Sequence, residues 1–247
     1  MLQRMIERRV DIDTPDGTMP TFVVHPEEGG PYPVVLYLMD APGIRPALRD
    51  MASRLATVGY YVLLPYLYYR GGPYREFTAS DEDMHARREL MATVTPEGLV
   101  SDAPALLDLA AGDPMASDGD VGVVGFCMSG RSVVALAQAY PERVAAGASI
   151  HGAWLVSDAD ESVHRHVDRV RAELYFGWAD DDPTAPREDL ATMAKALTDA
   201  GVRHRIDFME GALHGFAPPG HDNYDRAASE KHWERVFDLF ERNLRPG

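Results

Sequence analysis

The stretch GDVGVVGFCMSGRSVVALAQ, residues 119–138, joins the pattern of a buried strand to the pattern of a helix. Its apolar run VGVVG, residues 121–125, is typical of a parallel strand covered on both faces, and a helix is predicted at 129–140. Between them lies Cys127, the single cysteine of the 247-residue chain. Because a sharp turn between strand and helix lifts a side chain to the top of a sheet, this stretch predicts a nucleophile elbow.

The same alternation of strand and helix patterns continues on both sides of this stretch. Further strands are predicted at residues 9–13, 21–25, 33–39, 60–65, 147–150, 172–177 and 203–209, the first two joined around Asp16-Gly17. Further helices are predicted at residues 45–58, 80–92, 96–111, 187–200 and 225–244. Alternating strands and helices favour right-handed crossovers, and therefore an α/β fold with a mostly parallel central sheet and helices on both faces. We expect one domain spanning residues 1–247.

Composition narrows the possible partners. The chain has 24 Lys and Arg against 39 Asp and Glu, a formal net charge of −15, which argues against binding to nucleic acid or to an anionic membrane. One cysteine cannot form an internal disulfide, so we expect the protein to be located in the reducing cytoplasm. The charged start, residues 1–13, lacks the apolar core of a signal peptide, and no apolar run approaches the roughly 20 residues of a membrane span.

Cys127 is the predicted nucleophile of the elbow. The turn is crowded, so the residues two before and two after the nucleophile must be small, as Gly125 and Ser129 are. The N-terminus of the following helix favours the thiolate, the reactive form of cysteine. The alternative is a buried cysteine that packs as a small hydrophobic side chain. Ser129 is a rival nucleophile, but Arg131 is too large for the position two residues after it, and Ser129 suits the start of a helix.

A nucleophile of this kind needs a base and a carboxylate that orients the base, and in this architecture the chain order is nucleophile, acid, histidine. His214 is the favoured base because it follows the last predicted strand, in the Gly- and Pro-rich loop EGALHGFAPPG. The other histidines after Cys127 are His151, His164, His166, His204, His221 and His232.

The acid is expected in the segment WADDDPTAP, residues 178–186, which follows the strand predicted at 172–177. Asp182 lies four residues before Pro186, a spacing associated with the acid loop of this fold, and is favoured over Asp180 and then over Asp181. The two remaining aspartates would form a solvated acidic turn or cap the helix predicted to begin at 187.

Together these motifs resemble the dienelactone hydrolase family of the α/β-hydrolase fold. The similarity covers nearly the whole chain, through PVVLYLMDAPGIRPALRDMASRLATVGYYVLLPYLYYR, VGVVGFCMSGR, ELYFGWADDDPTAP and EGALHGFA. The Gly-Phe-Cys elbow is a fairly specific motif, since most relatives of the fold use serine. The resemblance implies a triad of Cys127, His214 and Asp182, a small ester or lactone substrate, and no metal or organic cofactor.

The resemblance also implies a mechanism. The thiolate attacks the carbonyl carbon of the ester or lactone, and the backbone N–H groups of Met128 and Ala41 hold the resulting oxyanion. The enol or alcohol then leaves, and a water molecule activated by His214 releases the acid.

Two positions depart from the family pattern. Asp40 stands where the family commonly has a glutamate that contacts the resting thiol. Aspartate is one methylene shorter, so the contact is expected to be longer or water-mediated, and capping of local backbone is the alternative. Pro218 stands where members that act on dienelactone carry an arginine for the substrate carboxylate. The family's other arginine corresponds to Arg87 or Arg88, although either could equally be an exposed helix charge.

The loss of one charge-assisted contact, worth about 1.5–3 kcal/mol, would shift preference toward another ester or lactone. Trp154 and Phe216 are expected to contact the substrate, and an apolar pocket could also include Tyr66, Tyr68, Tyr69, Phe77 and Trp178. Two alternative functions stay open: a general carboxylesterase with a different or larger substrate, and a scaffold that binds a small molecule or a protein without turnover. The protein is expected to be a monomer or a homodimer.

Overall fold

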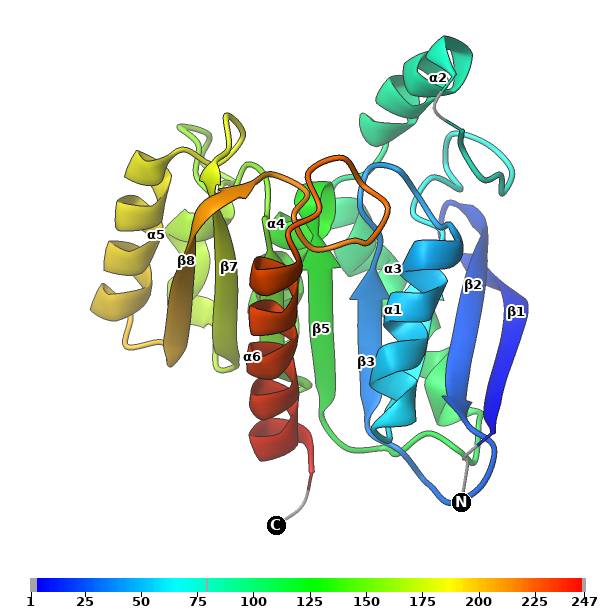
Figure 1. Cartoon of the computed structure of the whole chain (residues 1–247). Helices are drawn as coiled ribbons and strands as arrows, with labels where there is room; N and C mark the ends of the chain where they lie inside the picture. Colours follow the sequence, from blue (N-terminus) through cyan, green and yellow to red (C-terminus); the bar gives the residue numbers. More distant parts are fainter. Residues whose placement is uncertain (1–3, 79, 246–247) are drawn as a thin grey trace. The chain divides into compact units, whose positions relative to one another are not determined.

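The structure is a computed structural model that describes residues 4–78 and 80–245. The chain forms two compact units, Met1–Gly119 and Asp120–Gly247, coloured from blue to green and from green to red in Figure 1. The single domain of residues 1–247 stays a prediction.

The described residues of the first unit contain four strands in the order β1-β2-β4-β3. They are β1 (Met5–Thr14), β2 (Gly17–Pro26), β3 (Val34–Leu38) and β4 (Tyr61–Pro65). β2 pairs antiparallel with β1 and β4, whereas β3 pairs parallel with β4. Thr14 pairs with Gly17, whose φ of 138° requires a residue without a Cβ atom, so the predicted turn around Asp16-Gly17 is confirmed.

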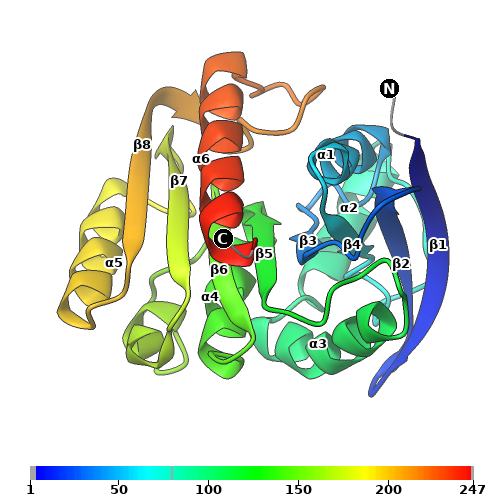
Figure 2. The same ribbon diagram turned by 90° about the horizontal axis from the view of Figure 1, so that it is seen from below.

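Helices cover both faces of these four strands, as Figure 2 shows for α1 and α3. The helices of this unit are α1 (Pro46–Thr57), α2 (Asp81–Met91) and α3 (Pro96–Ala111). Two of them begin with a capping side chain: Ser80 accepts a hydrogen bond from the amide of Asp83, and Thr95 accepts one from the amide of Gly98.

The described residues of the second unit contain four parallel strands in the order β5-β6-β7-β8. They are β5 (Val121–Phe126), β6 (Val144–Ile150), β7 (Glu173–Asp181) and β8 (His204–Leu213). Small residues allow close packing on this sheet. A Cβ atom on Gly147 would lie 2.8 Å from both Leu174 and Val133, closer than real side chains approach.

The helices of the second unit are α4 (Gly130–Ala139), α5 (Arg187–Asp199) and α6 (Arg226–Leu244), and two short 3₁₀ segments accompany them, η1 (Cys127–Ser129) and η2 (Val163–Arg169). Figure 2 shows α6 on one face of the strands and α4 with α5 on the other. Asp225 caps the start of helix α6, because its side chain accepts a hydrogen bond from the amide of Ala228. It lies so close to β5 that a Cβ atom on Gly122 would come within 2.8 Å of Leu244.

Every strand and helix expected from the sequence is present, with corrections of three or four residues at five ends. Three strands begin earlier than expected: β1 at Met5, β2 at Gly17 and β6 at Val144. Two strands continue further than expected, β7 to Asp181 and β8 to Leu213. Asp180 and Asp181 therefore lie within β7, and only Asp182 of the three aspartates follows it. The extension arises because Asp181 pairs with Leu213 beyond an irregularity in the ladder.

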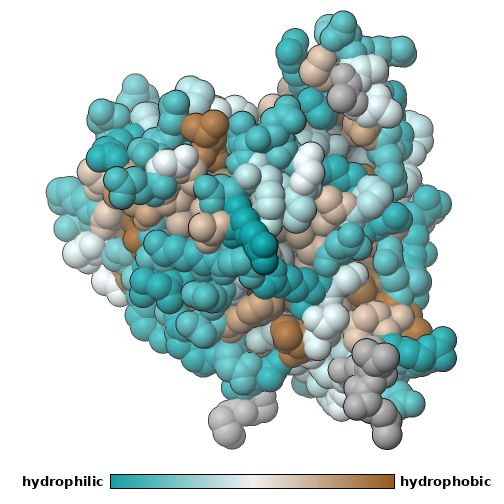
Figure 3. Space-filling view, viewed as in Figure 1, coloured by the Kyte–Doolittle hydropathy of each residue, from teal (hydrophilic) through white to brown (hydrophobic). Residues whose placement is uncertain are grey.

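Hydrophilic residues predominate on the face shown in Figure 3, and the most hydrophobic residues form small separate patches there. Within residues 4–78 and 80–245, no helix combines the length and the apolar character needed to cross a membrane.

Candidate active site

The turn after β5 holds Cys127 in a left-handed backbone conformation, with φ of 52°. This geometry brings neighbouring backbone very close. A Cβ atom on Gly125 would lie 2.7 Å from the carbonyl oxygen of Ser129, and one on Gly130 would lie 2.5 Å from Cα of Gly152. Glycine is therefore required on both sides of the cysteine, and a strained conformation of a non-glycine residue is typical of functional sites.

Ser129 stabilises this turn from inside. Its side chain is fully buried, and its Oγ accepts a hydrogen bond of 3.0 Å from the amide of Phe126 and donates one of 3.0 Å to the carbonyl of the same residue. The hydroxyl is thereby committed to the backbone, which favours Cys127 over Ser129 as the nucleophile.

Three side chains meet at the carboxyl ends of β5, β7 and β8. His214 Nε2 lies 3.0 Å from Cys127 Sγ, and His214 Nδ1 lies 2.6 Å from Asp182 Oδ2. The Asp182 side chain is buried, whereas 24% of the His214 side chain is exposed. Residues separated by 87 positions along the chain thus form one continuous row of sulfur, imidazole and carboxylate.

Asp182 has partners for both of its carboxylate oxygens. Its Oδ1 accepts hydrogen bonds from the amide of Thr184 at 2.8 Å and from the Thr184 hydroxyl at 2.6 Å. Burial alone would raise the pKa of Asp182, but the hydrogen bonds from His214 and Thr184 hold the pKa below its ordinary value. Asp182 is therefore ionised and fixed in orientation.

The surroundings of His214 favour its charged form. Burial lowers the pKa of His214, but the hydrogen bonds and charges of Asp182 and Cys127 outweigh burial and raise the pKa from 6.5 to about 10. In the imidazolium form Nδ1 donates to the carboxylate and Nε2 donates to the sulfur.

Asp180 and Asp181 are engaged elsewhere or point to solvent. Asp180 accepts hydrogen bonds from Arg187 at 3.3 Å and from the amide of Gly211 at 2.9 Å. Asp181 is exposed at the end of β7. Of the three candidates, the structure brings Asp182 to the histidine.

The loop after β6, residues 151–154, ties the cysteine turn to the acid loop through backbone hydrogen bonds. The amide of Ala153 donates to the carbonyl of Cys127 at 2.9 Å, and the amide of Trp154 donates to the carbonyl of Thr184 at 2.9 Å. His151 and Trp154 both have positive φ, of 38° and 53°. The Trp178 side chain also holds the acid loop, because its Nε1 donates to the carbonyl of Ala185 at 2.8 Å.

His151 is a site residue that sequence reasoning passed over. Its ring centre lies 5.1 Å from that of His214 and 5.1 Å from that of Phe216. Within the described residues neither ring nitrogen has a hydrogen-bond partner, and burial together with the neighbouring histidines holds the pKa of His151 well below 6.5. The available signal was its place directly after a strand, where sites of parallel sheets are found.

The two aromatic residues predicted to contact substrate lie differently. Trp154 is 40% exposed as a residue, and the guanidinium carbon of Arg131 lies 5.4 Å from the centre of its ring. Phe216 is fully buried against His151, so in this structure it packs behind the site.

Of the remaining predicted residues, Met128 lies in η1 of the second unit and is buried, whereas the other four belong to the first unit. Asp40 is buried, and its two oxygens accept hydrogen bonds from Arg45 at 2.6 and 2.9 Å. The carbonyl of Ala41 accepts a hydrogen bond from the Tyr68 hydroxyl at 2.7 Å. Arg87 and Arg88 lie on α2, the first half-buried and the second exposed. The roles proposed for these residues toward the thiol or the substrate stay predictions.

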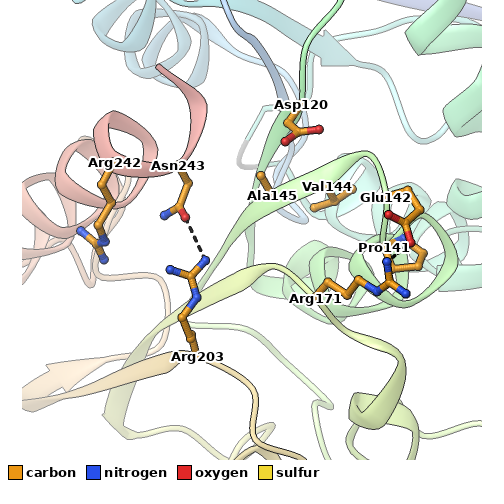
Figure 4. Close-up of a pocket in the computed structure, with 9 residues that line it drawn as sticks. All are labelled: Asp120, Pro141, Glu142, Val144, Ala145, Arg171, Arg203, Arg242 and Asn243. Carbon is orange, nitrogen blue, oxygen red and sulfur yellow. Dashed lines mark hydrogen bonds and ion pairs between the residues drawn. The ribbon is translucent and has the colours of Figure 1, made fainter. Parts of the chain in front are cut away.

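A pocket of about 460 Å³ lies at the amino ends of the strands of the second unit, lined by residues from the segments around β6 and from the end of α6 (Figure 4). Its three arginines already have acidic partners: Arg171 contacts Glu142, and both Arg203 and Arg242 pair with Glu173. Arg203 also donates a hydrogen bond to Asn243 at 3.2 Å. Because these charges are compensated, the pocket offers no uncommitted cation. Across the described residues, no group of three or more His, Cys, Asp or Glu side chains is arranged to hold a metal ion.

The chain belongs to the dienelactone hydrolase family, whose family model matches residues 19–244. A Synechocystis protein named as a candidate carboxymethylenebutenolidase is 30% identical over 247 residues, which cover 96% of this chain and 99% of that protein. A carboxymethylenebutenolidase of a Pseudomonas strain is 28% identical over 212 residues, 85% of this chain and 84% of its own. The chain is therefore a dienelactone hydrolase-like hydrolase with a small-molecule substrate.

The solved structure of a candidate dienelactone hydrolase from Klebsiella pneumoniae matches with a TM-score of 0.85 and 22% identity, covering 97% of this chain and 99% of that chain. This likeness confirms the predicted α/β-hydrolase fold.

Proposed function

We propose that this hydrolase cleaves small esters or lactones through Cys127 as nucleophile, His214 as general acid and base, and Asp182 as the orienting carboxylate. The observation that supports the proposal most directly is the row of contacts from Sγ to Nε2 at 3.0 Å and from Nδ1 to Oδ2 at 2.6 Å. These distances allow proton transfer between sulfur and imidazole while the carboxylate fixes the ring.

In the first half-reaction the Cys127 thiolate attacks the carbonyl carbon, a C–S bond forms and the carbonyl oxygen becomes an oxyanion. The amide of Met128, in the first turn after the nucleophile, is the proposed donor to that oxyanion, and the family resemblance assigns the second donor to Ala41. The ester C–O bond then breaks, and the leaving oxygen takes a proton from the His214 imidazolium. A thioester and a neutral His214 remain.

In the second half-reaction a water molecule gives a proton to neutral His214 and attacks the thioester carbonyl. The C–S bond breaks, the carboxylic acid product leaves, and the thiolate and the imidazolium return to their starting states. Asp182 stays ionised throughout and stabilises the positive charge on His214 each time it forms.

Hydrolysis of p-nitrophenyl acetate and of a dienelactone tests this function, with folding of each protein checked by circular dichroism. We expect the purified protein to hydrolyse at least one of them and to lose activity with iodoacetamide. Cys127→Ala should abolish turnover, and Cys127→Ser should show whether sulfur is required or an oxygen nucleophile suffices. Full activity of Cys127→Ala would remove the thiol from the mechanism. Absence of turnover across a wider ester and lactone panel would favour a binding scaffold.

A further inference from the structure

Trp154 combines an unfavourable backbone conformation with an exposed aromatic ring. Its φ of 53° lies in the left-handed region, which residues other than glycine adopt at a cost in free energy. The residue is 40% exposed, so burial of apolar surface compensates this cost only in part. A strained residue that contributes little to the core points to a role in function rather than in folding.

The position of Trp154 is fixed relative to two members of the row of contacts. The residue before it donates its amide to Cys127, and its own amide donates to Thr184, which in turn holds Asp182. The indole therefore stands on the short loop that connects the nucleophile turn to the acid loop.

Arg131 limits the movement of the indole. It lies in the first turn of α4, just after the nucleophile turn, and its guanidinium is within cation–π distance of the ring at 5.4 Å. Leu213, at the end of β8 and directly before His214, is 42% exposed. Of the three large hydrophobic residues that are exposed within the described residues, Leu213 precedes His214 and Trp154 lies on the loop that is hydrogen-bonded to the turn of Cys127.

We propose that Trp154 determines substrate specificity by stacking on an aromatic ring carried by the ester, so that aryl-substituted esters are preferred over saturated ones of the same size. The proposal rests on the proposed esterase function. An indole interacts favourably with another aromatic ring in offset-stacked or edge-to-face geometry. A puckered aliphatic ring does not provide this interaction energy. Because Arg131 already holds the indole in place, little side-chain entropy is lost when a substrate ring stacks on it.

Two matched ester pairs test the proposal. Benzyl acetate is compared with cyclohexylmethyl acetate for a ring on the alcohol side, and p-nitrophenyl phenylacetate with p-nitrophenyl cyclohexylacetate for a ring on the acyl side. In the wild type we expect the ratio of kcat/KM, aromatic over saturated, to exceed that of Trp154→Leu by about three- to tenfold in at least one pair. Trp154→Phe should retain most of the wild-type ratio, and Leu213→Ala should leave the ratio as in the wild type.

Trp154→Gly separates specificity from stability. Glycine adopts positive φ without strain, so we expect an unfolding temperature no lower than that of the wild type together with loss of the aromatic preference. A marked fall in unfolding temperature would instead assign Trp154 a structural role and overturn the proposal.

Unchanged ratios in both Trp154→Leu and Trp154→Gly would also overturn it, while leaving the esterase function intact. If the folded wild type hydrolysed none of the four esters and none of the lactones, the esterase function itself would fail, and this inference with it.

Discussion

At the scale of single residues, His214 lies between a buried carboxylate and a sulfur, and both of these groups raise the pKa of its imidazole. Both contacts favour the imidazolium, and together they outweigh the effect of burial. The two neighbouring aspartates in the sequence make no such contact, since Asp180 is engaged with Arg187 and Gly211. Asp182 and Asp180 have the same side chain but different partners, so their contributions to the rate can be compared by substituting each in turn.

Asp182→Asn is expected to lower kcat/KM for p-nitrophenyl acetate by about a hundredfold or more, because the amide cannot stabilise the imidazolium. Asp180→Asn is the matched control and should change the rate by less than about threefold, since that residue only loses partly exposed hydrogen bonds. Similar losses in the two variants would show that Asp182 is not the orienting carboxylate.

The raised pKa of His214 predicts the alkaline limb of the pH profile. The protonated form donates to the leaving oxygen, so kcat/KM should fall as the pH rises through about 10. Removal of the Asp182 charge takes away an interaction that raises the pKa, so the limb of Asp182→Asn should move to lower pH. Rates of benzyl acetate hydrolysis from pH 6 to 11, corrected for spontaneous hydrolysis, measure the limb in the wild type and in Asp182→Asn, because an alkoxide leaving group needs the proton. A limb at the same pH in both proteins would contradict this assignment.

At the scale of secondary-structure elements, the sequence predicted the strands and helices well because their patterns are local. The ends of β7 and β8 were wrong because they depend on pairing between residues 32 positions apart, Asp181 and Leu213. The same pairing decides which aspartate leaves the strand next to His214. The spacing to Pro186 favoured Asp182 from sequence, but it could not show that Asp180 is bound by the amide of Gly211.

The turn between β5 and α4 predicts a strong effect for a small substitution. In Gly125→Ala the new methyl group would lie 2.7 Å from the carbonyl oxygen of Ser129 and 2.8 Å from Val133, and the backbone oxygen cannot move away. We expect a loss of about 1–3 kcal/mol in the free energy of unfolding and a lower esterase rate. Gly72→Ala, where no atom lies within 4 Å of the new methyl group, should change stability by less than about 0.5 kcal/mol. Urea denaturation compares the two, and equal stabilities would contradict the crowding argument.

At the scale of the whole molecule, the candidate site gathers residues from segments that share no local pattern. The order of nucleophile, acid and histidine together with the strand ends was enough to predict Cys127, Asp182 and His214 as a group. His151 was missed because its proximity to His214 depends on the packing of Phe216 and Phe126 around it. The pairing of Asp40 with Arg45 was likewise not foreseen, although it bears on the suggested contact between Asp40 and the thiol.

The net charge of the molecule and the residue at position 218 both bear on how well a negatively charged substrate binds. Pro218 stands where the resemblance implies a cationic side chain, and the formal net charge of −15 repels anions at long range. Neutral lactones should therefore compete well with carboxylated ones, and added salt should raise kcat/KM only for the carboxylated compounds. Competition assays at low and high ionic strength measure both effects. A strong preference for carboxylated lactones at low salt would point instead to Arg87 or Arg88 as an anion-binding residue.

The loop that joins the nucleophile turn to the acid loop makes both of its connections with main-chain amides, those of Ala153 and Trp154. Any residue except proline supplies such an amide, so side chains without a branch at Cβ, which tolerate the positive φ of position 154, can be exchanged there while the spacing of the reacting groups persists. Natural variation or saturation mutagenesis at this one position can therefore change the substrate preference of the hydrolase while the proposed catalytic residues stay in place.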